Sequence, residues 1–582
     1  MSNLRKRWNL MVLVVLLLGL LPMVAVAQPA ARPDWSKVHP AVLATLEAEG
    51  RAGFYAILTA QADLSGAAAL RTKVEKTTYV FERLKVVAAE TQTPVTDYLR
   101  AQGVAYRSYY IQNMIEVKDA GRGVVQGLAA RSDVAQIMPM PNPQLDPVIA
   151  GMAPEQRREA IEWNITRIHA PDVWAMGIHG EGMVVGDNDT GVEYTHPALV
   201  SKYRGNLGGG LYDHNYNWWD AWDGAPSPTP VDYDGHGTHT MGTMVGDDGA
   251  GNQIGVAPGA QWIACAGLNL ECLEFFLAPW DLTGLNPKPD KAPDAVNNSW
   301  YDPSNYDYRP IVQTLNAAGI AVIKSAGNVG PGCGSISNPG YVPEIIATAA
   351  FANGDTIASF SSRGPMSKYG DTILKPEVAA PGVSVRSSIP GNGYAYYSGT
   401  SMAAPHTTAL VALMWNAAPC LQGDVPTTKD IMMWTAESKI DGQCPPYQGH
   451  PNDVWGWGIL DDLAAVQMAQ TYCTPLPSMH VRAIKMKYVD RGGGKYVPKA
   501  GATIVDESDV VLPGAMVYAQ WTLPGGATQD QTGVSHANGM AQFKLPTLLT
   551  GLFQFCVTDI TKTGYVYDPG RNGETCDTIA VP

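Results

Sequence analysis

The chain has 582 residues and a mass of 62.2 kDa, which is too long for one ordinary domain and predicts two to four folded units. Charged residues make up only 16% and hydrophobic residues 45%, which excludes a disordered chain and a long charged coiled coil. The 60 glycines and 43 prolines predict many turns, and the net charge of −14 argues against a nucleic acid partner.

The first 27 residues have the layout of a secretory signal peptide. Arg5, Lys6 and Arg7 form a basic start, an apolar run follows from Leu10 to Leu21, and small residues precede a cleavage site that we expect after Ala27. The apolar run is shorter than the roughly 20 residues that span a bilayer. We therefore expect a secreted, extracellular protein that keeps no stable membrane anchor after signal cleavage.

The cysteines contain no Cys-x-x-Cys pair, which disfavours a zinc ribbon and thioredoxin-type chemistry. In an exported protein they predict structural disulfides. We expect two local pairs, Cys420 with Cys444 and Cys556 with Cys576. The other four cysteines are Cys265, Cys272, Cys333 and Cys473.

Residues 28–150 predict a small α+β module followed by a linker. Hydrophobic periodicity predicts strands at 54–58, 109–117 and 134–138 and helices at 67–89, 95–102 and 124–130. Four prolines then lie within 139–147, and an arginine pair follows at 157–158. This composition predicts a linker that is open to proteolysis and a domain boundary near residue 150.

Residues 151–473 predict an α/β domain with a doubly wound parallel sheet. Short apolar runs alternate with helical segments, as expected for strands that helices cover on both faces. These runs lie at 183–186, 262–265, 295–298, 321–323 and 345–349. Ligands of such domains gather at the carboxyl ends of the strands.

Residues 474–582 predict a β-sandwich. Alternating apolar and polar residues indicate strands at 480–488, 515–521 and 553–557, and glycine-rich turns separate such segments.

Reactive side chains stand at the ends of central strands or at the starts of helices. Asp189 ends a buried strand, His236 opens a helix, and Ser401 lies in the first turn of a long apolar helix. A carboxylate can orient an imidazole, which as a base activates a serine hydroxyl. Asn328 follows another strand and could donate to an oxyanion together with the Ser401 N–H. The pattern predicts nucleophilic catalysis by serine.

Other interpretations were weighed for the polar residues. Taken alone, Ser401 would be interpreted as the N-cap residue of a helix. His236 and His239 could instead bind a metal ion, but the sequence shows no third ligand. We expect Asp187 to be a solvated turn residue and His406 a packed or hydrogen-bonded helix residue. An acidic cluster between residues 213 and 234 is expected to be a solvated loop, and a structural calcium site there is the alternative. Its members are Asp213, Asp220, Asp223, Asp232 and Asp234.

Four motifs resemble the signature blocks of the subtilisin-like serine proteases, in particular the bacillopeptidase-F-like branch. They are Asp-Thr-Gly at 189–191, His-Gly-Thr-His at 236–239, Ser-Ala-Gly-Asn at 325–328 and Gly-Thr-Ser-Met-Ala-Ala-Pro-His at 399–406. The order acid, histidine, serine argues against an α/β-hydrolase esterase. The resemblance implies that Asp189 orients the base His236, that Ser401 is the nucleophile and that Asn328 completes the oxyanion hole.

The resemblance also implies roles for further residues. Substrate is expected to bind along Ser299 and Trp300 on one side and Ala326 and Gly327 on the other, although Tyr301 stands where relatives usually carry glycine. The implied domains are a signal peptide (1–27), an inhibitory, ferredoxin-like propeptide and linker (28–150), a subtilisin-like peptidase domain (151–473) and an immunoglobulin-like accessory domain (474–582).

The implied function is a secreted serine endopeptidase, made as an inactive precursor, that cleaves proteins or peptides through an acyl-enzyme on Ser401. Its own propeptide would be an intramolecular inhibitor. No organic cofactor and no catalytic metal are expected. The alternative is a non-catalytic secreted binding protein on a subtilase fold.

Overall fold

The computed structural model describes residues 32–150, 161–222, 226–304, 306–474 and 476–582. The predicted signal peptide and the arginine pair at 157–158 lie outside these residues. The chain forms two compact units, Met1–Cys473 and Thr474–Pro582. Within the described ranges, no helix has both the length and the apolar character needed to cross a membrane.

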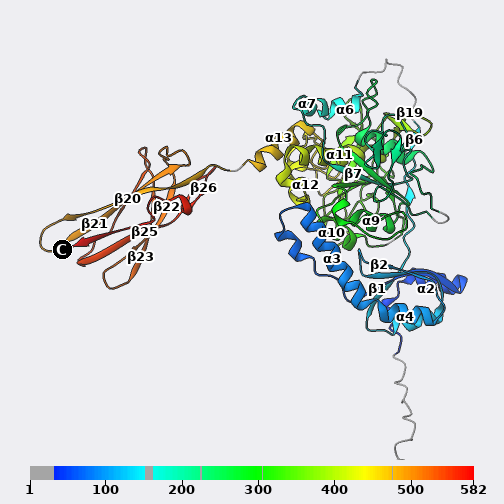
Figure 1. Ribbon diagram of the computed structural model, residues 1–582, viewed down its shortest axis with the longest axis horizontal. Helices are drawn as coiled ribbons and strands as arrows, with labels where there is room; N and C mark the ends of the chain where they lie inside the picture. Colours follow the sequence, from blue (N-terminus) through cyan, green and yellow to red (C-terminus); the bar gives the residue numbers. More distant parts are fainter. Residues whose placement is uncertain (1–31, 151–160, 223–225, 305, 475) are drawn as a thin grey trace, which may run out of the picture. The chain divides into compact units, whose positions relative to one another are not determined.

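The first unit begins with a four-stranded antiparallel sheet in the order β2-β3-β1-β4. Its strands are β1 (Arg51–Leu58), β2 (Tyr106–Tyr109), β3 (Met114–Gly121) and β4 (Val134–Pro139). The helices of this module are α2 (Pro40–Glu49), α3 (Lys73–Thr91), α4 (Thr93–Ala101) and α5 (Arg122–Ala129). The predicted α+β module is therefore present, and its α3 helix lies beside α10 (Arg309–Ala317) (Figure 1).

Two predicted boundaries in this module were wrong. Helix α3 begins at Lys73 rather than near 67 because Thr72 and Glu75 form a capping box, whereas Ser65–Ala69 is a separate 3-10 helix. The predicted strand 109–117 is interrupted by a turn at 110–113. Tyr110 and Ile111 in this turn are apolar because they are buried against the following domain, not because they continue a strand.

The central sheet has the order β10-β11-β7-β12-β14-β15-β16, with β17 also paired to β15. All neighbours are parallel except β15 and β16. The strands are β7 (Val184–Asp189), β10 (Trp218–Asp220), β11 (Gln261–Ala266), β12 (Ala295–Asn298), β14 (Ala321–Ser325), β15 (Ile346–Ala352), β16 (Thr356–Ile357) and β17 (Val378–Pro381). This confirms the predicted α/β class.

Helices cover both faces of this sheet. Alternate residues of β14 point to opposite sides, so that Ile323 joins the core cluster of α11 while Val322 joins that of α9 and α10. The helices of this domain besides α10 are α6 (Trp163–Arg167), α7 (Ala170–Ala175), α8 (His236–Val245), α9 (Leu270–Leu277), α11 (Thr400–Ala417), α12 (Val425–Thr435) and α13 (Asp462–Cys473). Because successive apolar residues of a strand point to opposite faces, both faces of the sheet are apolar and both are covered by helices, as in a doubly wound domain.

The segment after β4 is not the open linker that its prolines predicted. Strand β5 (Gln144–Leu145) pairs with β13 (Trp300–Tyr301), and β6 (Ile149–Ala150) pairs with β19 (Gly393–Ser398), which also pairs with β18 (Val385–Ile389). The pairing of β5 with β13 and that of β6 with β19 are both antiparallel. Proline lacks an N–H donor, but the residues between the prolines keep theirs and can complete two edge strands of the central domain.

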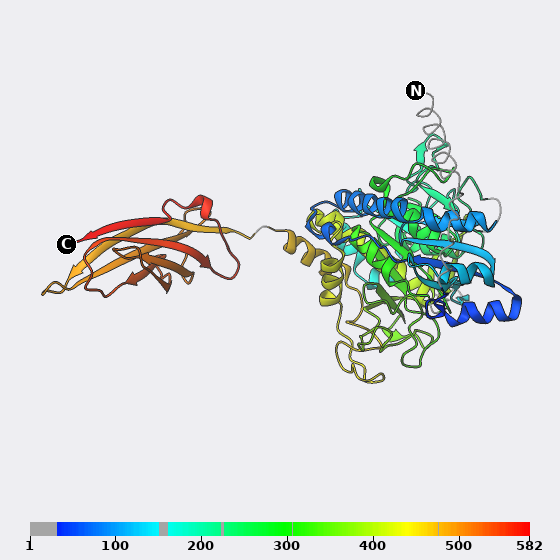
Figure 2. The same cartoon turned by 90° about the horizontal axis from the view of Figure 1, so that it is seen from below.

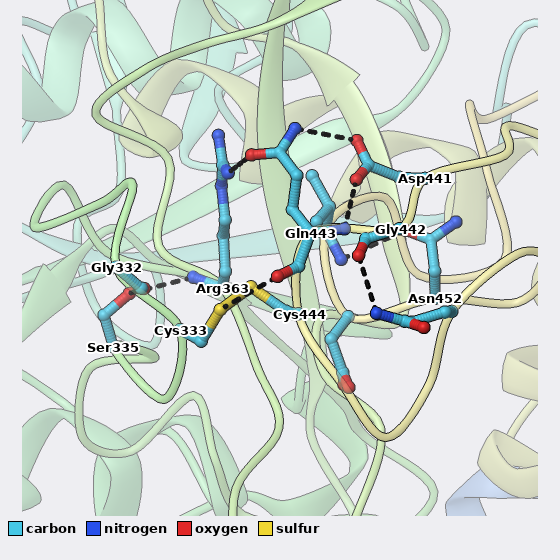
Figure 3. The surroundings of a disulfide bond; sticks show 12 residues. Gly332, Cys333, Ser335, Arg363, Asp441, Gly442, Gln443, Cys444 and Asn452 are labelled. Carbon is cyan, nitrogen blue, oxygen red and sulfur yellow. Dashed lines mark hydrogen bonds between the residues drawn. A yellow bond between two sulfur atoms is a disulfide. The ribbon is translucent and has the colours of Figure 1, made fainter.

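Four disulfides are present, and one of the two expected pairs was wrong. Cys420 pairs with Cys473 because the short helix Pro419–Leu421 packs against α13, which ends at Cys473. Cys444 pairs with Cys333, and Figure 3 shows the neighbouring Gln443 side chain bound to Arg363. The remaining pairs are Cys265–Cys272 and the expected Cys556–Cys576.

The second unit is a sandwich of two four-stranded sheets, as predicted. Their orders are β24-β21-β20-β26 and β23-β22-β25-β27, and long strands run lengthwise through the unit (Figure 2). Trp521, Phe543 and Phe555 pack in the core between them. The strands are β20 (Ser478–Asp490), β21 (Tyr496–Asp506), β22 (Met516–Thr522), β23 (Thr528–Val534), β24 (Met540–Lys544), β25 (Gly551–Thr561), β26 (Val566–Tyr567) and β27 (Cys576–Val581).

Candidate functional site

Three predicted site residues lie at one edge of the central domain. Asp189 is the last residue of β7, His236 is the first residue of α8, and Ser401 is the second residue of α11. Each side chain is buried, with a residue exposure of 1% or less. Helices α8 and α11 pack against each other and against β7, which brings these chain positions to the same region.

Asp189 and His236 form a hydrogen-bonded pair. His236 Nδ1 lies 2.7 Å from Asp189 Oδ1, which also accepts from the Thr190 N–H at 2.8 Å. Burial lowers the pKa of His236, but the charge and hydrogen bond of Asp189 outweigh burial and raise that pKa to about 9. Because Nδ1 donates to the carboxylate, Nε2 is the nitrogen that can give up and take back a proton, and no described residue bonds to it.

A further aspartate, Asp232, fixes the start of α8. Its Oδ2 accepts from the Thr238 N–H at 2.8 Å and from the Thr238 hydroxyl at 2.6 Å. Its Oδ1 accepts from the Gly235 N–H and from the Thr190 hydroxyl, which joins the end of β7 to the start of α8. Sequence reasoning missed this role, although an acidic residue just before a helix start is a capping signal.

Asp213 and Asp220, two other acidic residues of the predicted cluster, form hydrogen bonds within loops. Asp220 accepts from the Ser227 N–H at 2.8 Å, and Asp213 accepts from Asn215. Asp223 lies outside the described residues. Over the described part of the chain, no group of three or more His, Cys, Asp or Glu residues is arranged to hold a metal ion.

The other two histidines of the signature motifs are packed. His239 stacks on Tyr397, and its Nε2 lies 3.2 Å from the carbonyl of Ala395. His406 Nδ1 lies 2.9 Å from the carbonyl of Met402, which confirms the predicted packed role. Burial lowers the pKa of His406 to about 4, so that its imidazole is neutral.

Ser401 faces the strand that was predicted to bind substrate. Its hydroxyl donates to the Ser299 carbonyl at 3.3 Å, and the Ser299 hydroxyl donates to the Ser401 carbonyl at 3.1 Å. The cap position of α11 is Gly399, so Ser401 is not a capping residue. Its hydroxyl is therefore not engaged in capping the helix.

Asn328 is oriented by the residue before Ser401. Its Oδ1 accepts from the Thr400 N–H at 2.8 Å and from the Thr400 hydroxyl at 2.7 Å. These bonds turn Nδ2 the other way, where it donates to the Pro147 carbonyl at 3.2 Å. The carboxamide is thus held with Nδ2 as a donor to a backbone carbonyl of the segment 144–150.

The predicted substrate-binding residues lie close to Ser401 and to the segment 144–150. Trp300 pairs through its backbone with Leu145, and Gly327 donates its N–H to the Thr400 hydroxyl at 3.1 Å. Gly327 has a φ of 110°, and a Cβ there would lie 2.1 Å from the Ser337 hydroxyl, so only glycine fits. Ser299 and Ala326 are fully buried. Tyr301, the unusual residue, pairs with Gln144 and donates its hydroxyl to the Gln144 side chain.

The prediction that Asp187 is a solvated turn residue was wrong. Its residue exposure is 1%, and it bonds to the Thr240 hydroxyl at 2.7 Å and to Asn297 Nδ2 at 3.0 Å. Burial, together with the charge of Asp189, raises the pKa of Asp187 well above its ordinary value. Strand β7 continues to Asp189, and for this reason Asp187 lies within the sheet.

Known proteins resemble this chain over the same region. A model of the Subtilase family matches residues 180–458. Bacillopeptidase F of Bacillus subtilis (strain 168) is 41% identical over 430 residues, which cover 68% of this chain and 29% of that protein. A subtilisin of Bacillus pumilus is 31% identical over 267 residues, which cover 45% of this chain and 86% of that protein. The chain thus spans less than a third of bacillopeptidase F but most of the shorter subtilisin.

Proposed function

Because the chain belongs to the subtilase family of serine proteases, we propose that it hydrolyses peptide bonds in proteins through an acyl-enzyme on Ser401. The observation that carries this proposal is the buried hydrogen bond of 2.7 Å between Asp189 and His236. Helix α11, which carries Ser401, packs against both β7 and α8, the elements that carry this pair. A buried carboxylate that holds a histidine with Nε2 free is the arrangement that activates a serine.

The proposed chemistry uses groups of this chain alone. His236 Nε2 takes the proton of the Ser401 hydroxyl as Oγ attacks the carbonyl carbon of the substrate. The oxyanion of the tetrahedral intermediate accepts from Asn328 Nδ2 and from the Ser401 N–H. His236 then protonates the departing amine, and water releases the acid by the reverse sequence.

The variant Asn328→Leu should lower kcat by about 10² to 10³-fold with little change in KM, because the amide donor acts on charge that develops in the transition state. Steady-state kinetics on a peptide anilide would measure both constants. An unchanged kcat in a folded variant would exclude Asn328 from oxyanion stabilisation.

We propose that residues 28–150 inhibit the enzyme within the same chain. The support is the seating of residues 144–150 on both β13 and β19, with the Pro147 carbonyl bound to Asn328. The preceding module also contacts the central domain. Lys73 forms a buried ion pair with Asp294 at 3.2 Å, and the Glu274 carboxylate accepts from the N–H groups of Tyr110 and Ile111.

Such an arrangement keeps substrate out until the segment is cut. We propose that cleavage between about residues 139 and 163 yields the mature enzyme and that the protein is exported. The support for export is the layout of residues 1–27, together with four disulfides and no free cysteine among the described residues. Residues 474–582 would be an immunoglobulin-like accessory domain.

The test is to express the full chain with export and to purify the processed form. We expect an N-terminus downstream of residue 139, hydrolysis of casein, and loss of hydrolysis after treatment with a fluorophosphonate. A processed, folded protein with Ser401 intact that neither cleaves casein nor takes the label would favour the alternative, a binding protein on this fold.

A further inference from the structure

A lysine is buried beside the proposed cleft. Lys324 is the penultimate residue of β14, directly before the Ser-Ala-Gly-Asn segment, and its residue exposure is 0%. Burial lowers the pKa of Lys324 to about 8, so that most of it is still charged at neutral pH. A buried ammonium costs free energy unless a negative group compensates for it, and a buried lysine therefore needs an explanation.

The hydrogen bonds of Lys324 lead toward the cleft. Its Nζ donates to the Ser325 hydroxyl at 2.6 Å and to the Ser325 carbonyl at 2.9 Å. An ammonium group can only donate, so the Ser325 hydroxyl accepts from it and keeps its own proton for another acceptor. Ser325 therefore presents a polarised donor on the side away from Lys324.

The acceptor is Asp146, a residue of the segment that occupies the cleft. Leu145 pairs with Trp300, and the Pro147 carbonyl accepts from Asn328 Nδ2 at 3.2 Å, so Asp146, which lies between them in the chain, is held close to both segments. Asp146 is only 2% exposed although both of its neighbours along the chain are more open. Its buried side chain therefore lies beside the Ser-Ala-Gly-Asn segment, where it accepts from the Asn328 N–H and the Ser325 side chain.

The charges of Asp146 and Lys324 act mainly on each other. Burial raises the pKa of Asp146, and the strongest opposing influence is the charge of Lys324, followed by the Asn328 N–H, the charge of His236 and the Ser325 hydroxyl. For Lys324, the strongest influence that opposes burial is the charge of Asp146, ahead of Asp189. Asp146 Oδ2 is buried without a hydrogen-bond partner in the described part of the chain.

Asp146 must leave the cleft before a substrate can enter. The central domain then keeps the buried Lys324 ammonium and the Ser325 hydroxyl at the place that the Asp146 carboxylate has left. We call this place the Lys324 subsite. An acidic side chain of the substrate would restore the interaction, whereas an apolar side chain would leave the ammonium and hydroxyl without it.

We propose that Lys324, acting through Ser325, makes this subsite selective for aspartate or glutamate in the substrate, and that Asp146 occupies the subsite in the precursor. The inference rests on the proposed function, because it assigns a specificity to the same cleft. Lys324 and Ser325 are specificity-determining residues in this account and take no part in bond breaking.

The test is to profile the processed enzyme on a peptide library in which the positions around the cleaved bond are varied one at a time. We expect aspartate or glutamate to raise kcat/KM about 10- to 100-fold over leucine at one of the two positions before the cleaved bond. Lys324→Met should remove this preference while leaving cleavage of leucine peptides. Methionine keeps the length and apolar stem of lysine, so the variant removes a buried charge without leaving a large cavity.

The matched control is Lys429→Met, since Lys429 pairs with Glu377 and is largely buried in another part of the domain. It should keep the acidic preference. A wild-type enzyme that cleaves peptides with no acidic preference at either position would overturn the inference and leave the proposed function standing. An acidic preference that survives in Lys324→Met would also overturn it, and a processed protein that cleaves no peptide would overturn both.

Discussion

Replacing Ser401 with alanine should lower kcat for peptide hydrolysis by about 10⁶-fold, because no other group can form the acyl-enzyme. Steady-state kinetics with a peptide anilide would measure the loss. The variant should fold normally, since the Ser401 hydroxyl makes one hydrogen bond of 3.3 Å, to the Ser299 carbonyl. The precursor should also stay unprocessed if maturation is self-catalysed, and gel electrophoresis of the secreted protein would show this.

A buried serine elsewhere in the domain provides the control. Ser387 is fully buried and donates to the His239 carbonyl at 2.7 Å. Ser387→Ala should keep activity and processing. Hydrolysis by Ser401→Ala near the wild-type rate would contradict the proposed role of Ser401, whereas an inactive but processed variant would show that another protease cuts the precursor.

Two aspartates of one strand should respond very differently to the same substitution. Asp189→Asn should lower kcat/KM by about 10⁴-fold, because an amide cannot stabilise the charged imidazole and can donate to Nδ1, which favours the wrong tautomer. The pH profile should change as well. The charge of Asp189 raises the pKa of His236, so its removal lowers that pKa, and the acidic limb of the residual activity should move to lower pH.

Asp187→Asn should leave activity near that of the wild type. Burial and the charge of Asp189 raise the pKa of Asp187 well above its ordinary value, which favours the neutral carboxyl, and an amide resembles a neutral carboxyl in shape and hydrogen bonding. Thr240 can accept from the amide because its hydroxyl also has the Gly237 carbonyl, at 3.0 Å, to donate to. Equal losses in the two variants, measured by kcat/KM and thermal unfolding, would mean that Asp189 has no special role.

Local patterns predicted the class of the fold and the placing of the site residues in it. A buried strand just before Asp189 and helices that begin near His236 and Ser401 each follow from hydrophobic periodicity and flanking glycines within about ten residues, although the strand extends three residues beyond the predicted end at 186. Parallel strands then bring their carboxyl ends to one edge, which is a property of the α/β class and needs no knowledge of side-chain contacts.

The errors concern contacts between residues far apart in the sequence. The partner of Cys420 depends on the packing of the 3-10 helix at Pro419–Leu421 against α13, and the spacing of cysteines does not report this. The segment 144–150 appeared to be an open linker because its prolines are visible in the sequence, whereas the two edge strands that bind it are not. The sequence does not single out Lys324, because a lysine in an apolar strand gives no sign that it is buried or that the charge of Asp146, 178 positions away, acts on it.

The most direct measurement is to treat the processed protein with a fluorophosphonate and to locate the adduct by peptide mass spectrometry. The account predicts one adduct, on Ser401, that forms far more slowly when Asp189 is replaced by asparagine and is absent when Ser401 is replaced by alanine. An adduct on a different residue, or a folded and processed protein that takes no label, would contradict it.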